Sequence, residues 1–483
     1  MSKGSIRKEQ RDNKVDDQSI ENGAFESSFQ FSASAEKKLV RKIDLMVLPI
    51  MLFAYMMAFL DKQALNYTSL MGIQEDLHLV GSQYSWSSSI FYVGYFVFSY
   101  PASLMMIKFP LGKYLSTVFT LWAIVLACHA ATTNFAGLMV ARFFLGCTEA
   151  SLSPGFTLIT SLWYRTSEQP LRHGIWFCGN SLSSMFGSLI AVGILQIENS
   201  LTAWQWLFII FGIITFLWGV FMLFRLPDSP STAGFLTQEE KLIAIERIKA
   251  NQTGFKSSTV DKSQIMEAFT DVKTWLLAIL ILAANIPNGG FTTETRTDMV
   301  QFNGLVLQGF GFSALHTLLL GIPCGFVIFI FVLLSIIGSA LIYATDSVGS
   351  RYAGLLLMGA YSVTMPISMA MISSNIGGFT KKATVSAIYF MMYCAGNIIG
   401  PQLFFEREAP KYQSGFLAII ICLVVCVVDG FALLFYLRWT NIKHDKQRIM
   451  GPISEGREKH GVAPQTQLLD TTDLKNKEFR YVF

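Results

Sequence analysis

Charged residues are scarce in this sequence. Asp, Glu, Lys and Arg make up 14% of its 483 residues, whereas soluble globular domains carry about 25%. Hydrophobic residues reach 52%, the mean hydropathy is +0.45, and long uncharged runs recur along the whole chain. This composition excludes an ordinary soluble domain and predicts an all-α, polytopic membrane protein in contact with the lipid bilayer.

Several functional signatures are also missing. The net charge of +4 is spread over loops and tails, so no basic stripe predicts nucleic-acid binding. The seven cysteines fall within apolar runs, which indicates neither disulfides nor a metal site. No Walker motif is present, so we expect no nucleotide-driven pump, no cofactor and no enzymatic activity. The polar N-terminus predicts no cleavable signal peptide.

One apolar run contains a pair of opposite charges. Residues 135–164 are long enough to cross a bilayer, yet they include Arg142 and Glu149. At about 3.6 residues per turn, the spacing returns both side chains to nearly the same helix face, about 10 Å apart along the axis. Charges inside a membrane segment are costly and normally face a bundle interior or a water-filled cavity. The pair therefore indicates a polar pathway through a helical bundle.

The first half of the chain predicts six crossings that begin and end in the cytoplasm. Residues 1–42 are predicted to form a disordered tail, and its final basic cluster, KKLVRK, indicates a cytoplasmic N-terminus by the positive-inside rule. Short basic loops then alternate with loops that lack Lys and Arg across residues 43–225. The expected spans are 43–68, 84–107, 115–131, 135–164, 173–195 and 204–224.

Residues 226–273 are predicted to form a cytoplasmic linker between two membrane halves. LPDSPSTAGF breaks any helix, and Thr237 followed by Glu240 is a capping box that opens a new helix running to about Ala250. Acidic residues lie in its first turn and basic residues in its last, which suits the helix dipole.

The second half, residues 274–440, is less regular. Spans are expected at 272–286, from 314 onwards, and at 352–373, 383–404 and 415–437, followed by a polar cytoplasmic tail, 441–483, with no core. The uncharged run 314–345 has 32 residues, about 48 Å if helical, whereas two crossings need about 40 residues. The basic residues Lys381 and Lys382 nevertheless require an even number of crossings here. The eighth and ninth spans are therefore shortened, leaving about 11 apolar runs.

Motifs along most of the chain resemble one transporter family. They are AFLDKQALNY in the first span, ARFFLGCTEASLSPGF in the fourth, LPDSPSTAGFLTQEEK in the linker, NIPNGG in the seventh and NIGGFTKKATVSAIYFMMYCAGNIIGPQLF in the eleventh. In this order they resemble the major facilitator superfamily and, more narrowly, the fungal anion:cation symporters of the allantoate permease type. The resemblance implies a major facilitator fold of 12 spans in two six-helix halves.

The chain departs from that family pattern at two places. An extra loop, FTTETRTDMVQ at 291–301, follows NIPNGG, and FIFVLL joins SIIGSALIY directly near 334–335, where the family has a span end, a basic loop and a span start. We interpret these as errors in the gene model or in splicing, with a retained intron and a lost exon segment. A transcript read across codons 285–350 that matched this sequence would contradict the interpretation.

Six polar residues within the spans are candidate site residues. An anion needs a fixed positive charge, and a coupled proton needs a carboxylate in a desolvated setting. The guanidinium fork suits a carboxylate substrate because it binds bidentately. We assign substrate binding to Arg142, Lys62, Asn180 and Asn397, and proton coupling to Glu149 and Asp61.

Each candidate also has a purely structural alternative. Arg142 can brace neighbouring helices, and Glu149 can make a helix-packing hydrogen bond. Asp61 and Lys62 point about 100° apart, so they cannot both face one target, and they can instead form an interfacial pair that reaches outward. The two asparagines can serve packing alone.

The resemblance implies secondary active import of a small organic anion by proton symport and alternating access. Its substrate class includes allantoate, ureidosuccinate, vitamin-like carboxylates and small peptides. We expect a monomer in the plasma membrane, with both termini in the cytoplasm. Two alternatives stay open, namely a nutrient sensor of the same fold that does not transport, and a defective permease.

Overall fold

A computed structural model describes residues 32–80, 83–197, 201–249, 251, 260–294, 331–340, 357, 359–403, 413–450, 470–476 and 479–482. Every regular element in these ranges is a helix. Seven helices are long and apolar enough to cross a membrane, and two shorter apolar helices cover Val272–Asn288 and Phe331–Ala340. The predicted all-α polytopic fold is therefore confirmed over these ranges.

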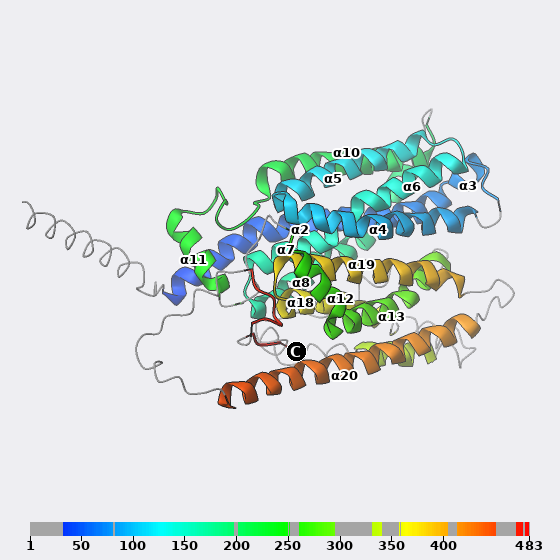
Figure 1. The fold of residues 1–483 in the computed structure, drawn as a ribbon. Coiled ribbons are helices and arrows are strands. Elements are labelled where there is room, and N and C mark those ends of the chain that lie inside the picture. Colours follow the sequence, from blue (N-terminus) through cyan, green and yellow to red (C-terminus); the bar gives the residue numbers. More distant parts are fainter. Residues whose placement is uncertain are drawn as a thin grey trace, which may run out of the picture.

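The helices form two groups that lie side by side (Figure 1). In the first group α4 packs on α6, α5 on α10 and α2 on α9, and in the second group α13 packs on both α19 and α20. The two groups touch through α4 and α19. The first group comprises α2 (Ala33–Leu70), α3 (Ile73–Asp76), α4 (Gln83–Lys108), α5 (Leu111–Cys128), α6 (Phe135–Glu149), α7 (Leu152–Trp163), α8 (Gln169–Phe177), α9 (Gly179–Leu195) and α10 (Ala203–Arg225). The second comprises α13 (Val272–Glu294), α18 (Thr364–Asn375), α19 (Phe379–Gln402) and α20 (Gln413–Met450).

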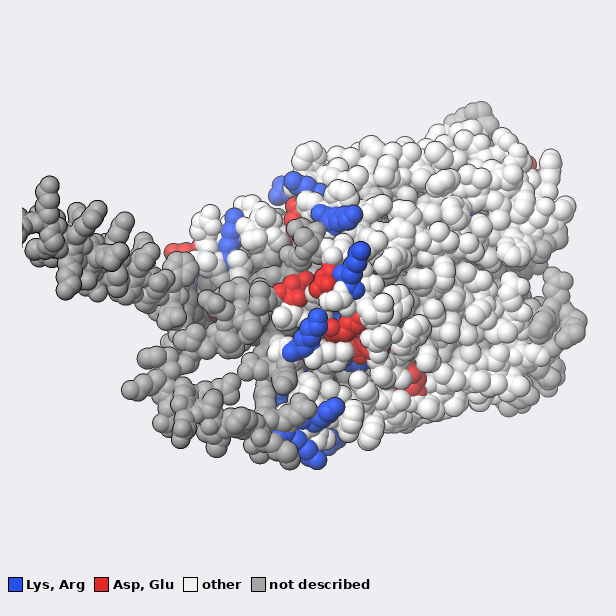
Figure 2. Space-filling model, viewed as in Figure 1, with Lys and Arg blue, Asp and Glu red and all other residues white. Residues whose placement is uncertain are grey.

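Charged side chains gather at one end of the bundle. Figure 2 shows them near α11 and α12, whereas most of the remaining visible face is uncharged. Large apolar side chains such as Phe224, Leu217, Val428 and Phe435 are 63–83% exposed along α10 and α20. Such a surface suits lipid contact, because hydrocarbon neither hydrates charges nor penalises exposed apolar groups. We call the polar end the charged end.

The linker provides one short helix to each group. The predicted capping box at the start of α11 (Gln238–Lys249) is confirmed: the Glu240 amide donates to Thr237 Oγ1 at 3.3 Å, and the Thr237 amide to Glu240 Oε2 at 2.8 Å. The fully buried Arg247 ties α11 to the first group through Glu168 Oε1 at 2.6 Å. The second linker helix, α12 (Lys262–Thr270), packs against α19.

Two glycines let α4 and α6 approach closely. A Cβ on Gly146 would collide with the carbonyl of Phe91, and one on Gly94 would collide with the carbonyl of Phe143. Because both obstacles are backbone, neither can rotate away. This contact sets the distance between α4 and the face of α6 that carries Arg142 and Glu149.

We expect Gly146→Ala to destabilise the protein, because the added methyl group forces the two backbones apart. Overpacking of this kind costs about 1–3 kcal/mol. Gly193→Ala in α9 is the matched control, since a Cβ there meets nothing within 4 Å and alanine is the better helix former. Thermal unfolding of the purified variants measures the difference, and coincident curves for Gly146→Ala and the unmodified protein would contradict the prediction.

The two departures from the family pattern lie largely outside the ranges that the structure describes. Residues Phe331–Ala340 form one continuous helix across the junction at 334–335. The predicted extra loop at 291–301 begins within α13, which continues to Glu294, and the rest of it lies outside the described residues. The interpretation as a gene-model or splicing error stays a prediction.

The C-terminal tail differs from its prediction. Helix α20 continues to Met450, and a separate segment, residues 470–476 and 479–482, packs on the second group. Within it, Asp473 is 0%, Phe479 1% and Tyr481 3% exposed. The prediction that this tail has no core is therefore wrong for that segment. The polar composition of this segment did not indicate its burial, because the groups that bury it come from helices elsewhere in the chain.

Candidate functional site

A buried ion pair joins α2 to α6. Lys62 Nζ lies 2.6 Å from Glu149 Oε1, and the two side chains are 20% and 2% exposed. The neighbouring Asp61 is 0% exposed. The interfacial alternative, in which Asp61 and Lys62 reach outward, is therefore wrong, because both side chains turn into the bundle.

The Asp61 carboxylate is buried without a direct partner. Neither oxygen accepts a hydrogen bond from any residue that the structure describes. The group interacts electrostatically with Glu149, Arg142 and Lys62. A buried ionised carboxylate without hydrogen bonds is costly. Asp61 therefore needs a proton, or a donor that arrives with a ligand, to offset its burial.

Arg142 lies on the same buried face of α6 as Glu149, as the spacing predicts. The two residues are 2% and 3% exposed. The buried Arg142 Nε has no hydrogen-bond partner in the described part of the chain. Arg142 also interacts electrostatically with Asp61, Tyr84 and Tyr92. Asp61, Lys62, Arg142 and Glu149 thus form one group of charges, which we call the central cluster.

Aromatic rings from both halves lie over Lys62 of the central cluster. Lys62 Nζ lies 5.8 Å from the ring centroid of Phe91 on α4 and 5.7 Å from that of Tyr393 on α19. The Tyr393 ring centroid is 6.2 Å from that of Tyr92 and 6.1 Å from that of Tyr95. Cation–π contacts of this kind stabilise a lysine away from water. The sequence did not mark these rings as site residues, since no local pattern pairs α4 with α19.

The two asparagine candidates lie apart from one another. Asn397 is 1% exposed and belongs to a network within the second half. Its side chain accepts from Asn288 at 2.7 Å and donates to Asn285 at 3.3 Å, while the Tyr361 hydroxyl donates to Asn288 at 2.9 Å. These contacts agree with a packing role for Asn397. Asn180 is half-buried on α9, a helix that packs against α2.

The two halves also meet at the charged end. Ser374 at the end of α18 donates to Gln169 Oε1 on α8 at 3.0 Å, and Ser373 Oγ lies 3.4 Å from His173 Nε2. Gln169 and His173 are 0% exposed, and the two serines are at most 5% exposed. In this conformation the bundle is therefore closed between α18 and α8.

Comparison with known proteins gives consistent matches over most of the chain. The model described as Major Facilitator Superfamily matches residues 51–401. An uncharacterized transporter of Schizosaccharomyces pombe is 35% identical over 94% of this chain and 90% of its own. The allantoate permease of Saccharomyces cerevisiae is 35% identical over 92% of this chain and 86% of its own.

A solved structure supports the same fold. The proton:xylose symporter XylE superposes with a TM-score of 0.63 at 11% identity, over 81% of this chain and 96% of that one. The sequence and structure matches thus cover both groups of helices.

Proposed function

Because the chain belongs to the major facilitator superfamily, and is thus a multi-pass membrane transporter, not an enzyme, we propose that it imports a small organic anion together with a proton. The observation that carries this proposal is the central cluster. Asp61, Arg142 and Glu149 are buried between helices of the first half, and the Lys62 side chain is 20% exposed. The ring of Tyr393 from the second half lies over Lys62 Nζ. A site of this kind, between two halves that move, is what alternating access requires.

The charge balance of the cluster favours co-transport. Lys62 and Arg142 carry two positive charges, and Asp61 and Glu149 carry two negative charges, so the cluster is formally neutral. One bound monoanion would leave one uncompensated negative charge inside the membrane, which is costly. One added proton restores neutrality. The anion and the proton therefore stabilise each other's binding, and this reciprocal coupling is the basis of symport.

Different members of the cluster serve the two ligands. Arg142 Nε has no hydrogen-bond partner among the described residues, and the guanidinium fork fits a carboxylate. Lys62 can turn from Glu149 to the substrate when Glu149 is neutralised. Asp61 is the first candidate to accept the proton, because its ionised form accepts no hydrogen bond from the described residues that would offset its burial. Glu149 is the second, and its protonation weakens the ion pair with Lys62.

The orientation and the substrate class follow from the charges and the relatives. We propose that the charged end is cytoplasmic and that both termini lie on that side, since basic residues favour it. The similarity to the allantoate permease, at 35% sequence identity, favours allantoate, ureidosuccinate or a vitamin-like carboxylate as the substrate, with small peptides as a further class. We propose a monomer in the plasma membrane.

Uptake of labelled anions by permease-null yeast tests this proposal. We expect accumulation that rises in acidic medium and disappears when a proton uncoupler is added, because the proton gradient drives the cycle. Uncoupler-resistant uptake would contradict proton symport. No uptake of any tested anion by well-expressed surface protein would favour the alternatives of a nutrient sensor or a defective permease.

A further inference from the structure

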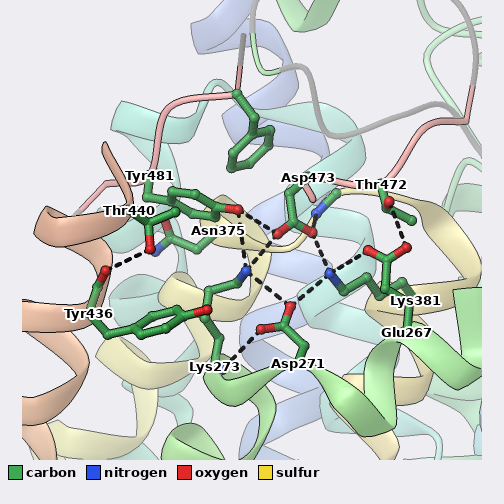
Figure 3. A network of polar contacts seen from close by, with 12 residues as sticks. Glu267, Asp271, Lys273, Asn375, Lys381, Tyr436, Thr440, Thr472, Asp473 and Tyr481 are labelled. Atoms are coloured by element: carbon green, nitrogen blue, oxygen red, sulfur yellow. Dashed lines mark hydrogen bonds and ion pairs between the residues drawn. The ribbon is translucent and has the colours of Figure 1, made fainter. Parts of the chain in front are cut away.

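A segment of the C-terminal tail is built into the charged end of the second half. It comprises residues 470–476 and 479–482, and we call it the C-terminal strap. Figure 3 shows Asp473 and Tyr481 of the strap among side chains of α12, α13 and α19. Asp473, Thr472, Phe479 and Tyr481 are each at most 3% exposed. Such burial of a charged tail residue requires a receiving site of matched chemistry.

The carboxylate of Asp473 is the anchor of the strap. Lys273 Nζ lies 2.7 Å from its Oδ2, and Lys381 Nζ lies 2.8 Å from its Oδ1. The Gly377 amide also donates to Oδ1 at 3.0 Å, and the Tyr481 hydroxyl to Oδ2 at 2.9 Å. The two lysines are at most 1% exposed and come from different helices, α13 and α19.

The same lysines also pair with carboxylates of the second half. Asp271 Oδ2 lies 3.0 Å from Lys273 Nζ and 2.7 Å from Lys381 Nζ, and Glu267 Oε1 lies 2.9 Å from Lys381 Nζ. Asp473 thus joins a buried network of opposite charges that links the strap to both lysines.

This anchor holds over the whole physiological pH range. Burial by itself raises the pKa of Asp473, but the two lysines outweigh burial and hold the pKa below its ordinary value. A carboxylate whose pKa is lowered in the docked state contributes binding that is fully present above its ordinary pKa of 3.8 and is lost only as the pH falls below it. Docking of the strap is therefore not expected to change with cytoplasmic pH.

The turn between α18 and α19 is shaped to receive the strap. A Cβ on Gly377 would lie 2.6 Å from the Asp473 amide nitrogen, so only glycine lets the two backbones approach. Gly378 has φ +86°, in the left-handed region that favours glycine. Asp470 Oδ1 accepts from the amide of Phe379, the first residue of α19, at 2.7 Å. The strap thereby caps the helix that follows the turn.

Two asparagines hold the far end of the strap by its backbone. Asn375 Oδ1 accepts from the Val482 amide, and its Nδ2 donates to the Val482 carbonyl, both at 2.7 Å. Asn441 of α20 makes the same reciprocal pair with Tyr481, at 3.0 and 2.9 Å. These two clamps, the capping contact and the buried anchor together make a peptide-binding site.

We infer that the strap is an intramolecular ligand of the charged end and that, when docked, it stabilises the conformation in which the two halves are closed there. The connection runs through three consecutive residues. Asn375 binds the strap, whereas Ser374 and Ser373 contact Gln169 and His173 of the first half. A docked strap therefore fixes the segment that closes against α8. Release of the strap loosens this segment and favours opening.

Hydrogen exchange of the full-length protein tests the docking. We expect Asp473→Asn to accelerate exchange of the strap amides about 100-fold, because it removes the carboxylate by which the strap pairs with Lys273 and Lys381. Leu474→Asn is the matched control, since Leu474 is 42% exposed on the same segment. In this variant we expect the strap amides to exchange as slowly as in the unmodified protein. Slow exchange of α5 and α10 amides in both variants verifies folding. Unchanged strap exchange in Asp473→Asn would overturn the inference.

Labelling at position 374 tests the consequence for closure. Ser374→Cys is introduced into the full-length protein with Asp473, with Asp473→Asn or with Leu474→Asn. A polar maleimide is added from the charged side, and mass spectrometry measures label at residue 374. We expect several-fold faster labelling only with Asp473→Asn. Equal labelling despite accelerated strap exchange would overturn the role in closure, and neither readout depends on a substrate.

Discussion

Arg142→Ala is expected to abolish anion uptake, with a loss of about 100-fold or more at matched surface expression. In the proposed complex Arg142 pairs with the carboxylate of the bound anion. Truncating one member of such a buried, hydrogen-bonded charge pair costs about 2–5 kcal/mol, and each 1.4 kcal/mol is tenfold in affinity. The substitution also leaves the central cluster with two carboxylates and one lysine. That negative cluster repels the anion that the site must accept. Initial rates of labelled uptake measure the effect.

Two companion variants separate the loss of the Arg142 side chain from a general disturbance of α6, and the positive charge from the guanidinium fork. Phe144→Ala alters α6 at a side chain that is 53% exposed on the bundle surface, and we expect it to retain uptake. Arg142→Lys keeps the positive charge but lacks the planar fork, so we expect partial uptake with a raised KM. Uptake by Arg142→Ala equal to that of the unmodified protein would restrict Arg142 to bracing the helices.

Asp61→Asn is expected to abolish accumulation of the anion against a gradient while preserving exchange of labelled for unlabelled anion. The amide imitates a permanently protonated carboxylate at a position that is 0% exposed. The cluster then accepts the anion but cannot release the proton, so the empty carrier does not return. We expect the pH dependence of substrate binding to disappear as well. Parallel accumulation and counterflow assays in vesicles measure the two activities.

The control for Asp61→Asn is an exposed carboxylate near the C-terminal end of α20. Asp445→Asn removes an exposed ion pair with Arg480, whose side chains are 42% and 52% exposed. Such surface pairs contribute about 0–1 kcal/mol, and we expect both accumulation and counterflow to be retained. If Asp61→Asn also accumulates the anion normally, the coupled proton binds elsewhere, with Glu149 as the next candidate.

Much of the fold and part of the site can be predicted from the sequence. Long apolar runs fix where helices cross the membrane, since each must satisfy its own backbone hydrogen bonds there. The positions of Arg142 and Glu149 on one helix face follow from helical periodicity alone, and the structure buries both. The capping box at Thr237 and Glu240 is equally local, and it is present. Each of these depends on residues close together in the chain.

Other features depend on contacts that no local pattern encodes. For Asp61 and Lys62 the sequence left open whether the side chains reach outward or face the bundle, because a helix position alone does not say which neighbour covers it. The partner of Lys62 lies on another helix, and the rings over it come from α4 and from α19 in the other half. The burial of Asp473 depends on two lysines that are far from it in sequence.

The sequence by itself determined that this chain is a helical membrane protein of the major facilitator type with a charged helix face in its fourth span. Periodicity, hydropathy and motif order suffice for that, because they act within single helices. Only the tertiary structure decided that Lys62 pairs with Glu149, that Asp61 accepts no hydrogen bond from the described residues, and that the tail docks at the charged end. Those outcomes follow from desolvation and charge pairing between segments brought together only by folding.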